Sequence, residues 1–105
     1  VIYFDFDKYE ISEVALDKIK YFIKENNKLI DKFLVVGHTD TVGTNNYNKQ
    51  LSLQRAEAVK NILVDMGFKY NNIKILGKGE SDLSIKTIDE VPHPVNRRAE
   101  ISLLN

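Results

Sequence analysis

Residues 33–40 read Phe-Leu-Val-Val-Gly-His-Thr-Asp, and this stretch decides how the rest of the chain folds. Its apolar residues at 33–36 form a continuous run of strand formers, which is typical of a strand buried on both faces in the middle of a sheet. Gly37 ends the run, and the polar stretch 38–48 that follows has no periodicity. Eleven irregular residues are long for a simple connection, so we expect a binding loop there.

An amphipathic helix is predicted on each side of this strand. The first is expected to begin at Ser12 as its N-cap and to end where Asn26, Asn27 and Lys28 break the pattern. The second is expected to begin at Asn48 and to end at the left-handed stop Gly67. The apolar stripes are Ala15, Leu16, Ile19, Phe22 and Ile23 in the first helix, and Ser52, Ala56, Val59, Ile62, Leu63 and Met66 in the second. Each apolar stripe is expected to pack against a sheet.

Three further segments have the patterns of strands. Residues 1–7 and 98–104 alternate between apolar and polar, and residues 73–76 are a short apolar run. The side chains expected to face the core are Ile2, Phe4 and Phe6 in the first strand and Ala99, Ile101 and Leu103 in the last. With the irregular segment 80–96, this order predicts one α+β domain over residues 1–105, a two-layer sandwich of a mixed four-stranded sheet with both helices on one face.

The composition excludes several classes of function. Fifteen basic residues balance fifteen acidic ones, so no overall field favours nucleic acid or an anionic membrane. The chain has no Cys, and its two histidines, His38 and His93, are not paired at helical spacing, so we expect neither a metal nor a cofactor. No apolar run reaches the roughly 18 residues that span a bilayer. We therefore expect any membrane anchor to lie outside these 105 residues.

Two charged residues at unusual positions form the candidate site. Asp40 follows the strand at 33–36, and Arg55 lies beside the apolar stripe of the next helix. A carboxylate at a strand end and a guanidinium on the following helix can meet across one loop. Together they would complement the ammonium and the carboxylate of an amino-acid-like ligand. Each also has an ordinary explanation, because Asp40 suits a turn and Arg55 could reach solvent or pair with an internal carboxylate.

Charged residues at other strand ends offer further candidates. Arg97 has the parity of the inward-facing residues of the last strand, so it is expected on the core side, whereas Arg98 is expected to point outward with Glu100. The ordinary explanation for Arg97 is a strand-end charge that reaches solvent. Asp7 also lies at a strand end, and with Asp40 it could supply the acid and the nucleophile of a glycosidase.

Short motifs follow one another in a distinctive order along the whole chain. They are Phe4-Asp5-Phe6-Asp7, Gly37-His38-Thr39-Asp40, Gly43, Asn48, Leu51-Ser52, Arg55-Ala56, Val59, Leu63, Gly67, Gly79-Glu80 and Asn96-Arg97-Arg98. This combination resembles the OmpA-like peptidoglycan-binding domain, which OmpA C-terminal domains, peptidoglycan-associated lipoproteins and the MotB stator protein share. The opening residues 3–9 are most similar to the lipoprotein branch.

The resemblance implies a non-enzymatic domain that binds peptidoglycan non-covalently through the diaminopimelate residue of its stem peptide. In that case Asp40 and Arg55 would hold the amino and carboxylate groups of this residue. The other binding residues that it implies are Thr39 and Asn48 on the loop side, Asp7 and Phe6 on the first-strand side and Arg97 on the last-strand side. The resemblance further implies a periplasmic domain that tethers the outer membrane, or another envelope assembly, to the cell wall of a Gram-negative bacterium.

Two alternatives stay open at this point. One is a peptidoglycan hydrolase that uses Asp7 and Asp40, and the other is a module whose main partner is another envelope protein. In the lipoprotein branch the propeller protein of the Tol system has that role, and the sequence does not decide whether it does so here. The stretch 81–95, with Pro92-His93-Pro94, departs from the commonest forms of the family.

Overall fold

A computed structural model describes residues 1–26, 32–83, 85–87, 91 and 93–104 of the chain. The four strands are β1 (Ile2–Tyr3), β2 (Lys32–Gly37), β3 (Ile73–Gly77) and β4 (Arg98–Leu104). The helices are α1 (Glu13–Asn26) and α2 (Asn45–Asp65), with the short 3-10 helices η1 (Tyr70–Asn72) and η2 (Pro94–Asn96). The sheet has the order β1-β4-β2-β3, in which β2 is parallel to β3 and antiparallel to β4. This confirms the predicted mixed four-stranded sheet.

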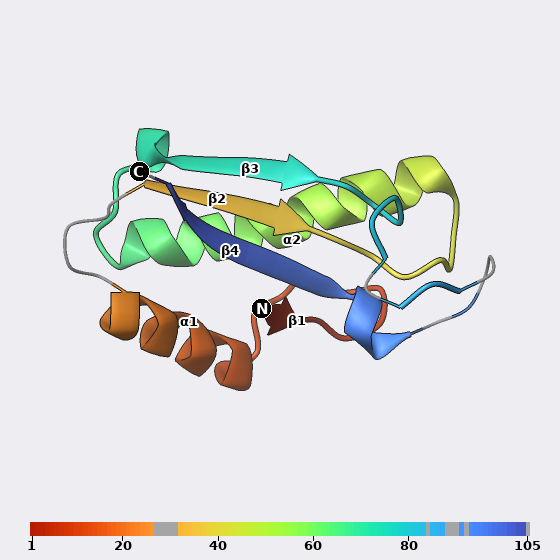
Figure 1. Ribbon diagram of the computed structural model, residues 1–105, viewed down its shortest axis with the longest axis horizontal. Helices are drawn as coiled ribbons and strands as arrows, with labels where there is room; N and C mark the ends of the chain where they lie inside the picture. Colours follow the sequence, from red (N-terminus) through yellow and green to blue (C-terminus); the bar gives the residue numbers. More distant parts are fainter. Residues whose placement is uncertain (27–31, 84, 88–90, 92, 105) are drawn as a thin grey trace.

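Both helices pack on one face of the sheet. Figure 1 looks onto the opposite face, with α2 behind β2 and β3. The buried core joins residues of every strand and both helices: Ile2, Phe4, Ala15, Ile19, Ile23, Phe33, Val35, Ala56, Val59, Leu63, Ile73 and Ala99. In β2 the side chains of Phe33 and Val35 are buried, whereas Leu34 and Val36 are only partly buried. The prediction that this strand is buried on both faces is therefore wrong, because helices cover only one of them.

The first helix begins as the sequence predicts. The Ser12 hydroxyl accepts a hydrogen bond of 3.1 Å from the backbone N–H of Ala15, which is the geometry of an N-cap. The helix ends at Asn26, and the predicted break at residues 27 and 28 lies outside the described residues. None of the helices in the described ranges is long and apolar enough to cross a membrane.

The second helix begins earlier than predicted. Thr44, not Asn48, is the N-cap, since its side chain accepts a hydrogen bond from the backbone N–H of Tyr47. Threonine and asparagine are both good caps, and the positive φ of Gly43 (96°) turns the chain immediately before Thr44. The predicted end is confirmed, because Gly67 follows the helix with a φ of 104°. The polar loop after β2 is accordingly shorter than the sequence suggested.

The first strand is shorter than predicted. It ends at Tyr3, although the N–H of Phe4 still donates to the carbonyl of Arg97 at 2.9 Å. A turn then follows, in which the N–H of Lys8 donates to the Asp5 carbonyl and Asp7 has a φ of 56°. The turn takes Phe6 out of the strand pattern, so this ring is 49% exposed although the sequence placed it in the core.

Two glycines let α2 lie directly against the strand ends. A Cβ at Gly37, the last residue of β2, would lie 1.8 Å from the carbonyl oxygen of Ser52. At Gly77, the last residue of β3, it would lie 2.7 Å from the backbone nitrogen of Leu53. Because no larger residue fits at either position, α2 approaches the sheet edge closely there. This contact brings Arg55, one turn further along the helix, to the loop that follows β2.

Candidate functional site

A small pocket of about 230 Å³ lies where the turn after β1, the loop after β2 and the first turns of α2 meet. Its lining residues are Phe6, Asp7, Asp40, Val42, Gly43, Tyr47, Asn48, Leu51 and Arg55. Asp40 and Arg55, which the sequence predicts to meet across one loop, thus share one pocket. Pockets for drug-sized ligands measure roughly 300–1,000 Å³. This one is therefore of a size for a single amino-acid head group rather than for a glycan chain.

The Arg55 side chain is fully buried and is held by backbone carbonyls. Its Nε donates to the Lys8 carbonyl at 2.9 Å, Nη1 to the His38 carbonyl at 2.9 Å and Nη2 to the Asp5 carbonyl at 3.2 Å. Neither ordinary explanation for Arg55 describes this arrangement, because the side chain does not reach solvent and these three bonds go to no carboxylate. A guanidinium has five N–H donors. Three make these bonds, and the other two make no hydrogen bond to the described residues.

The charge of Arg55 persists in spite of its burial. Loss of solvent lowers the pKa of this guanidinium to about 10, with a further lowering by Arg97, while Asp40 and Asp7 oppose the shift. A group with that pKa is protonated at neutral pH. The floor of the pocket therefore carries a buried cation, and Asp40 and Asp7 are close enough to favour its charged form.

The Asp40 carboxylate organises the opposite wall. Its Oδ1 accepts a hydrogen bond from the N–H of Val42 at 3.2 Å, which is the pattern of a turn-forming Asp. Its Oδ2 accepts from the N–H of His93 and from Nη1 of Arg97, both at 3.3 Å. Arg97, rather than Arg55, is therefore the direct ion-pair partner of Asp40.

Arg97 connects several parts of the site without lining the pocket. Its Nε donates to the Phe4 carbonyl at 3.1 Å, and its guanidinium carbon lies 5.9 Å from the centre of the exposed Phe6 ring. The side chain is part-buried, with 14% of its surface exposed. Through Phe4, Phe6 and Asp40, Arg97 ties the start of β4 to the turn after β1 and to the loop after β2.

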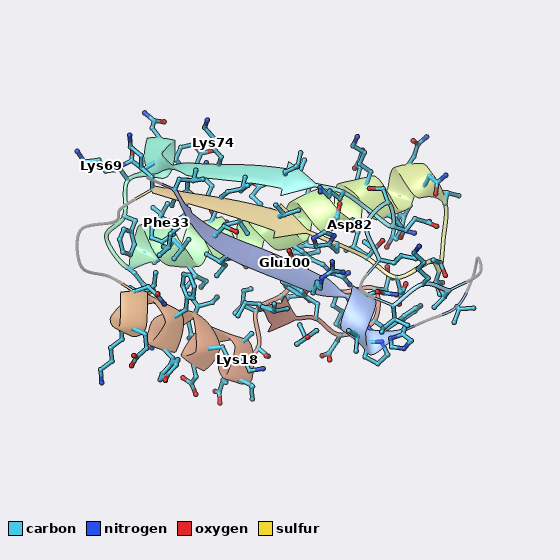
Figure 2. The ribbon with its side chains drawn as sticks, in the orientation of Figure 1. Lys18, Phe33, Lys69, Lys74, Asp82 and Glu100 are labelled. Carbon is cyan, nitrogen blue, oxygen red and sulfur yellow. The ribbon has the colours of Figure 1, made fainter. Side chains whose placement is uncertain are left out.

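Arg98 lies on the side of β4 that carries Glu100, as predicted, but it does not reach solvent, because it is 4% exposed. Its Nε donates to Glu100 at 2.7 Å and its Nη2 to the carbonyl of Asp82 at 3.0 Å. Figure 2 labels Asp82 and Glu100 over the face of the sheet that α2 does not cover. The segment after β3 covers Arg98 on this face, which the alternation of β4 alone does not reveal.

Tyr47 is a pocket residue that the sequence analysis missed. Its hydroxyl donates a hydrogen bond to the carboxylate of Asp7, and this bond raises the pKa of Tyr47. The bond joins α2 to the turn after β1 across one side of the pocket. Tyr47, Leu51 and Arg55 follow one another at four-residue spacing, which places them on one helix face. That signal is visible in the sequence once the helix is taken to begin at Asn45.

Thr39 and Asn48 have different places relative to the pocket. Asn48 lines it, and its Nδ2 donates to the Asp40 carbonyl at 3.4 Å and to Glu80 at 3.1 Å. Thr39 is buried and does not line it, because its hydroxyl donates to the carbonyl of Asp40 and its N–H to that of Gly79, both at 2.9 Å. Thr39 therefore supports the loop that carries Asp40 instead of facing a ligand.

Charges of both signs surround the pocket. Asp7, Asp40 and Arg55 line it, and Arg97 is paired with Asp40. In the described ranges no three His, Asp or Glu side chains come together as metal ligands. An arrangement of both signs around a small volume is suited to a ligand that carries both signs itself.

His38, which follows β2, is buried, and its carbonyl accepts a hydrogen bond from Arg55. Its imidazole affects the stability of the folded protein. Neither ring nitrogen has a hydrogen-bond partner among the described residues, and Nε2 lies 3.7 Å from the carboxylate of Glu100. Burial lowers the pKa of His38, and Arg98 and Lys78 lower it further, while Glu100 and Asp82 act in the opposite direction. The folded protein therefore binds this proton less readily than the unfolded chain does.

This difference predicts a pH dependence of folding. Because the unfolded chain takes up the proton near the ordinary pKa of 6.5, the free energy of unfolding should decrease as the pH falls from about 7.5 to about 5.5. Replacing His38 with Gln should remove the part of the pH dependence that comes from this imidazole. The carboxylates are the same in both proteins, so their contribution to the pH dependence stays unchanged. Urea unfolding of both proteins at several pH values measures the effect. Parallel slopes for the two proteins would show that His38 does not contribute.

The fold is that of an α+β domain with a mixed four-stranded sheet. The chain belongs to the OmpA family, whose sequence profile it matches over residues 3–97. It is 37% identical to outer membrane porin F of Pseudomonas aeruginosa, over 92% of this chain and 28% of the porin. It is 35% identical to the peptidoglycan-associated lipoprotein of Pasteurella multocida, over 96% of this chain and 68% of the lipoprotein. The family resemblance seen in the sequence is thereby confirmed.

A solved structure shows the same architecture. The crystal structure of the peptidoglycan-associated lipoprotein from Burkholderia pseudomallei aligns with a TM-score of 0.79 and 29% identity, covering 98% of this chain and 88% of that one. The chain thus spans nearly all of one solved relative but little more than a quarter of the porin.

Proposed function

We propose that this domain is a non-catalytic module that binds peptidoglycan through the diaminopimelate residue of the stem peptide. The observation that carries the proposal is the pocket of about 230 Å³, with Asp7, Asp40 and Arg55 on its walls and Arg97 paired to Asp40. The diaminopimelate side chain ends in an ammonium and a carboxylate on the same carbon. That head group has the size and the paired charges which the pocket complements.

Each group of the ligand has a counterpart in the pocket. The ligand ammonium would approach Asp40, whose carboxylate it would share with Arg97. The ligand carboxylate would accept from the two N–H groups of Arg55 that the backbone carbonyls do not use. Asn48 and Phe6 would flank the head group. Because three backbone bonds hold Arg55 in place before the ligand arrives, little side-chain entropy is lost on binding.

The alternative function, a hydrolase that uses Asp7 and Asp40, has less support from the contacts of these two acids. A glycosidase acid must deliver a proton to the leaving group. Each oxygen of Asp40 already accepts a hydrogen bond from the protein, and Asp7 accepts one from Tyr47. Both carboxylates are thus engaged with other parts of the protein, and these contacts favour binding over cleavage.

The names of the relatives support a place in the cell envelope. They describe an outer membrane porin and two peptidoglycan-associated lipoproteins. We place this domain in the periplasm of a Gram-negative bacterium, where it would tether the outer membrane or another envelope assembly to the cell wall. A second partner among envelope proteins, such as those of the Tol system, is compatible with this role.

The proposal is tested by calorimetry with two tripeptides that differ only in the third residue, diaminopimelate or lysine. Lysine keeps the ammonium but lacks the carboxylate that Arg55 would bind. We expect at least about tenfold weaker binding of the lysine peptide, which corresponds to about 1.4 kcal/mol. Equal affinities would contradict the proposed role of the pocket. Soluble fragments released from purified sacculi by the domain would instead support the hydrolase.

A further inference from the structure

A second pocket adjoins the pocket that contains Asp40 and Arg55. This second pocket, called the Arg97 pocket below, measures about 360 Å³ and is lined by Tyr3, Phe4, Asp5, Pro94, Val95 and Arg97. The two pockets share no lining residue, but they meet at the Arg97 guanidinium. Its Nη1 donates to Asp40 at 3.3 Å, and its carbon lies 5.9 Å from the centre of the Phe6 ring. A ligand in the first pocket therefore has the Arg97 pocket beside it.

The helix η2, which forms one wall of the Arg97 pocket, is tied to Asp40 at both of its ends. The N–H of His93, just before η2, and Nη1 of Arg97, just after it, both donate to Oδ2 of Asp40. Within η2 the buried side chain of Asn96 bonds to the N–H and to the carbonyl of Ile85. Figure 1 shows η2 at the start of β4, next to β1. This wall is thus held in a fixed position relative to the acid that would bind the ligand ammonium.

The Arg97 pocket combines a cation with apolar surface. Two N–H groups of the guanidinium donate to Phe4 and Asp40, and the other three make no hydrogen bond to the described residues. Beside the guanidinium, Tyr3 and Val95 are 46% and 36% exposed, so part of the apolar wall faces solvent. A guanidinium binds a carboxylate more strongly than it binds a neutral acceptor. The pocket is therefore suited to a carboxylate that is carried by a small apolar group.

Asp5 adds a hydrogen-bond acceptor to the same pocket. Its side chain is exposed and makes no hydrogen bond to the described residues. This acid would repel a ligand that presented a carboxylate alone. A residue at the end of a peptide also presents its backbone N–H, which a carboxylate accepts. Asp5 and Arg97 together therefore match the N–H and the carboxylate of one C-terminal residue.

We propose that the Arg97 pocket binds the residue that follows diaminopimelate in the stem peptide, which is D-alanine in a tetrapeptide stem. Its terminal carboxylate would accept from the unused N–H groups of Arg97, and its N–H would donate to Asp5. Its methyl group would contact Pro94 and Val95. This inference rests on the proposed binding of diaminopimelate in the first pocket, and it adds a preference for how the stem ends.

The preference would be a property of this chain rather than of the whole family. Pro94 and Val95 belong to the stretch 81–95, which departs from the commonest forms of the family. A second carboxylate next to diaminopimelate belongs to the D-glutamate that precedes it. The methylenes of that residue lead on to diaminopimelate, whereas the methyl group of D-alanine is free to contact the apolar wall. The pocket therefore favours D-alanine.

Calorimetry with two tetrapeptides tests the proposal. Both have the sequence L-Ala-γ-D-Glu-meso-diaminopimelate-D-Ala, and they differ only in the terminal group, which is a carboxylate or a carboxamide. We expect the carboxylate form to bind at least about tenfold more tightly, since the carboxamide lacks the charge that Arg97 would bind. Val95→Glu, which puts an acid on the wall beside Arg97, should bring the two affinities to within about twofold of each other.

The matched control is Val14→Glu. It makes the same change at a valine of α1 that is 67% exposed and lines neither pocket. The difference of about tenfold between the two tetrapeptides should persist in this variant. Circular dichroism of both variants checks that each is folded in the binding experiment. An equal difference in the Val95→Glu and Val14→Glu proteins would contradict the proposal.

The ligands separate a failure of this inference from a failure of the proposed function. If the two tetrapeptides bind equally, but more tightly than a tetrapeptide with lysine in place of diaminopimelate, the Arg97 pocket does not hold the terminal residue and the proposed function stands. If neither tetrapeptide binds, both proposals are wrong. A third tetrapeptide has the α-carboxylate of its D-glutamate amidated. If only this change weakens binding, the pocket holds the residue before diaminopimelate, and the assignment to D-alanine is overturned.

Discussion

Replacing Arg55 with alanine is expected to lower the free energy of unfolding by about 3–5 kcal/mol. The side chain is fully buried, and its loss leaves the carbonyls of Lys8 and His38 without their donor and removes one of the two donors to the Asp5 carbonyl. Each buried acceptor left unpaired costs about 1–3 kcal/mol, part of which water entering the space can recover. Urea denaturation followed by circular dichroism measures the change.

Two further variants separate this effect from a general effect of charge. Lys49→Ala removes an exposed cation from the same helix and should change stability by no more than about 0.5 kcal/mol. Arg55→Lys keeps the charge but cannot reproduce the planar fork, so it should recover only part of the loss. An Arg55→Ala protein within about 1 kcal/mol of the original would mean that these three bonds do not stabilise the fold. Binding experiments at this position therefore require Arg55→Lys, whose folding is expected to be better preserved.

Replacing Asp40 with asparagine is expected to weaken binding of the diaminopimelate tripeptide by about 2–5 kcal/mol, or about 30-fold to 5,000-fold. The shape of the side chain is kept, but the ligand ammonium loses its counter-charge. Arg97 also loses its ion-pair partner in a part-buried position. The ligand ammonium would then meet a guanidinium whose charge is not compensated, so attraction becomes net repulsion. Calorimetry with the tripeptide and co-sedimentation with purified sacculi both measure this loss.

The matched control is Asp65→Asn, which removes an exposed carboxylate at the far end of α2 and should leave binding unchanged. Urea unfolding of both variants shows whether the Asp40→Asn protein is folded under the conditions of the binding experiment. If a folded Asp40→Asn protein binds the tripeptide within about threefold of the original, the acid is not the ammonium partner. The proposed orientation of the ligand would then have to be abandoned.

The position of the site follows from contacts that are not local in sequence. Gly37 and Gly77 allow α2 to press on the ends of β2 and β3, and this sets the distance from Arg55 to the His38 carbonyl. The same close contact buries the guanidinium and lowers its pKa. Packing of the helix on the sheet thus creates both the floor of the pocket and the charge placed there.

The sequence by itself determined the order of the helices and strands, several of their ends and the family. Side-chain periodicity and caps act over a few residues, so Ser12 and Gly67 could be identified as helix boundaries without knowledge of the rest of the chain. The order of the elements then fixed the mixed sheet, and the motifs around Asp40 and Arg55 identified the OmpA family. The choice of Asn48 as the cap failed because Thr44, which is also a good cap, lies four residues earlier in the loop.

Only the tertiary structure decided which charges meet. The sequence paired Asp40 with Arg55, but Arg97, 57 residues from Asp40, makes the direct ion pair, and Arg55 bonds to carbonyls from two other loops. The burial of Arg98 likewise depends on the segment after β3, where the carbonyl of Asp82 accepts a hydrogen bond from Arg98. The physical reason is that the energy of a charge depends on the groups that surround it in space. Those groups come from strands and loops whose proximity no local pattern encodes.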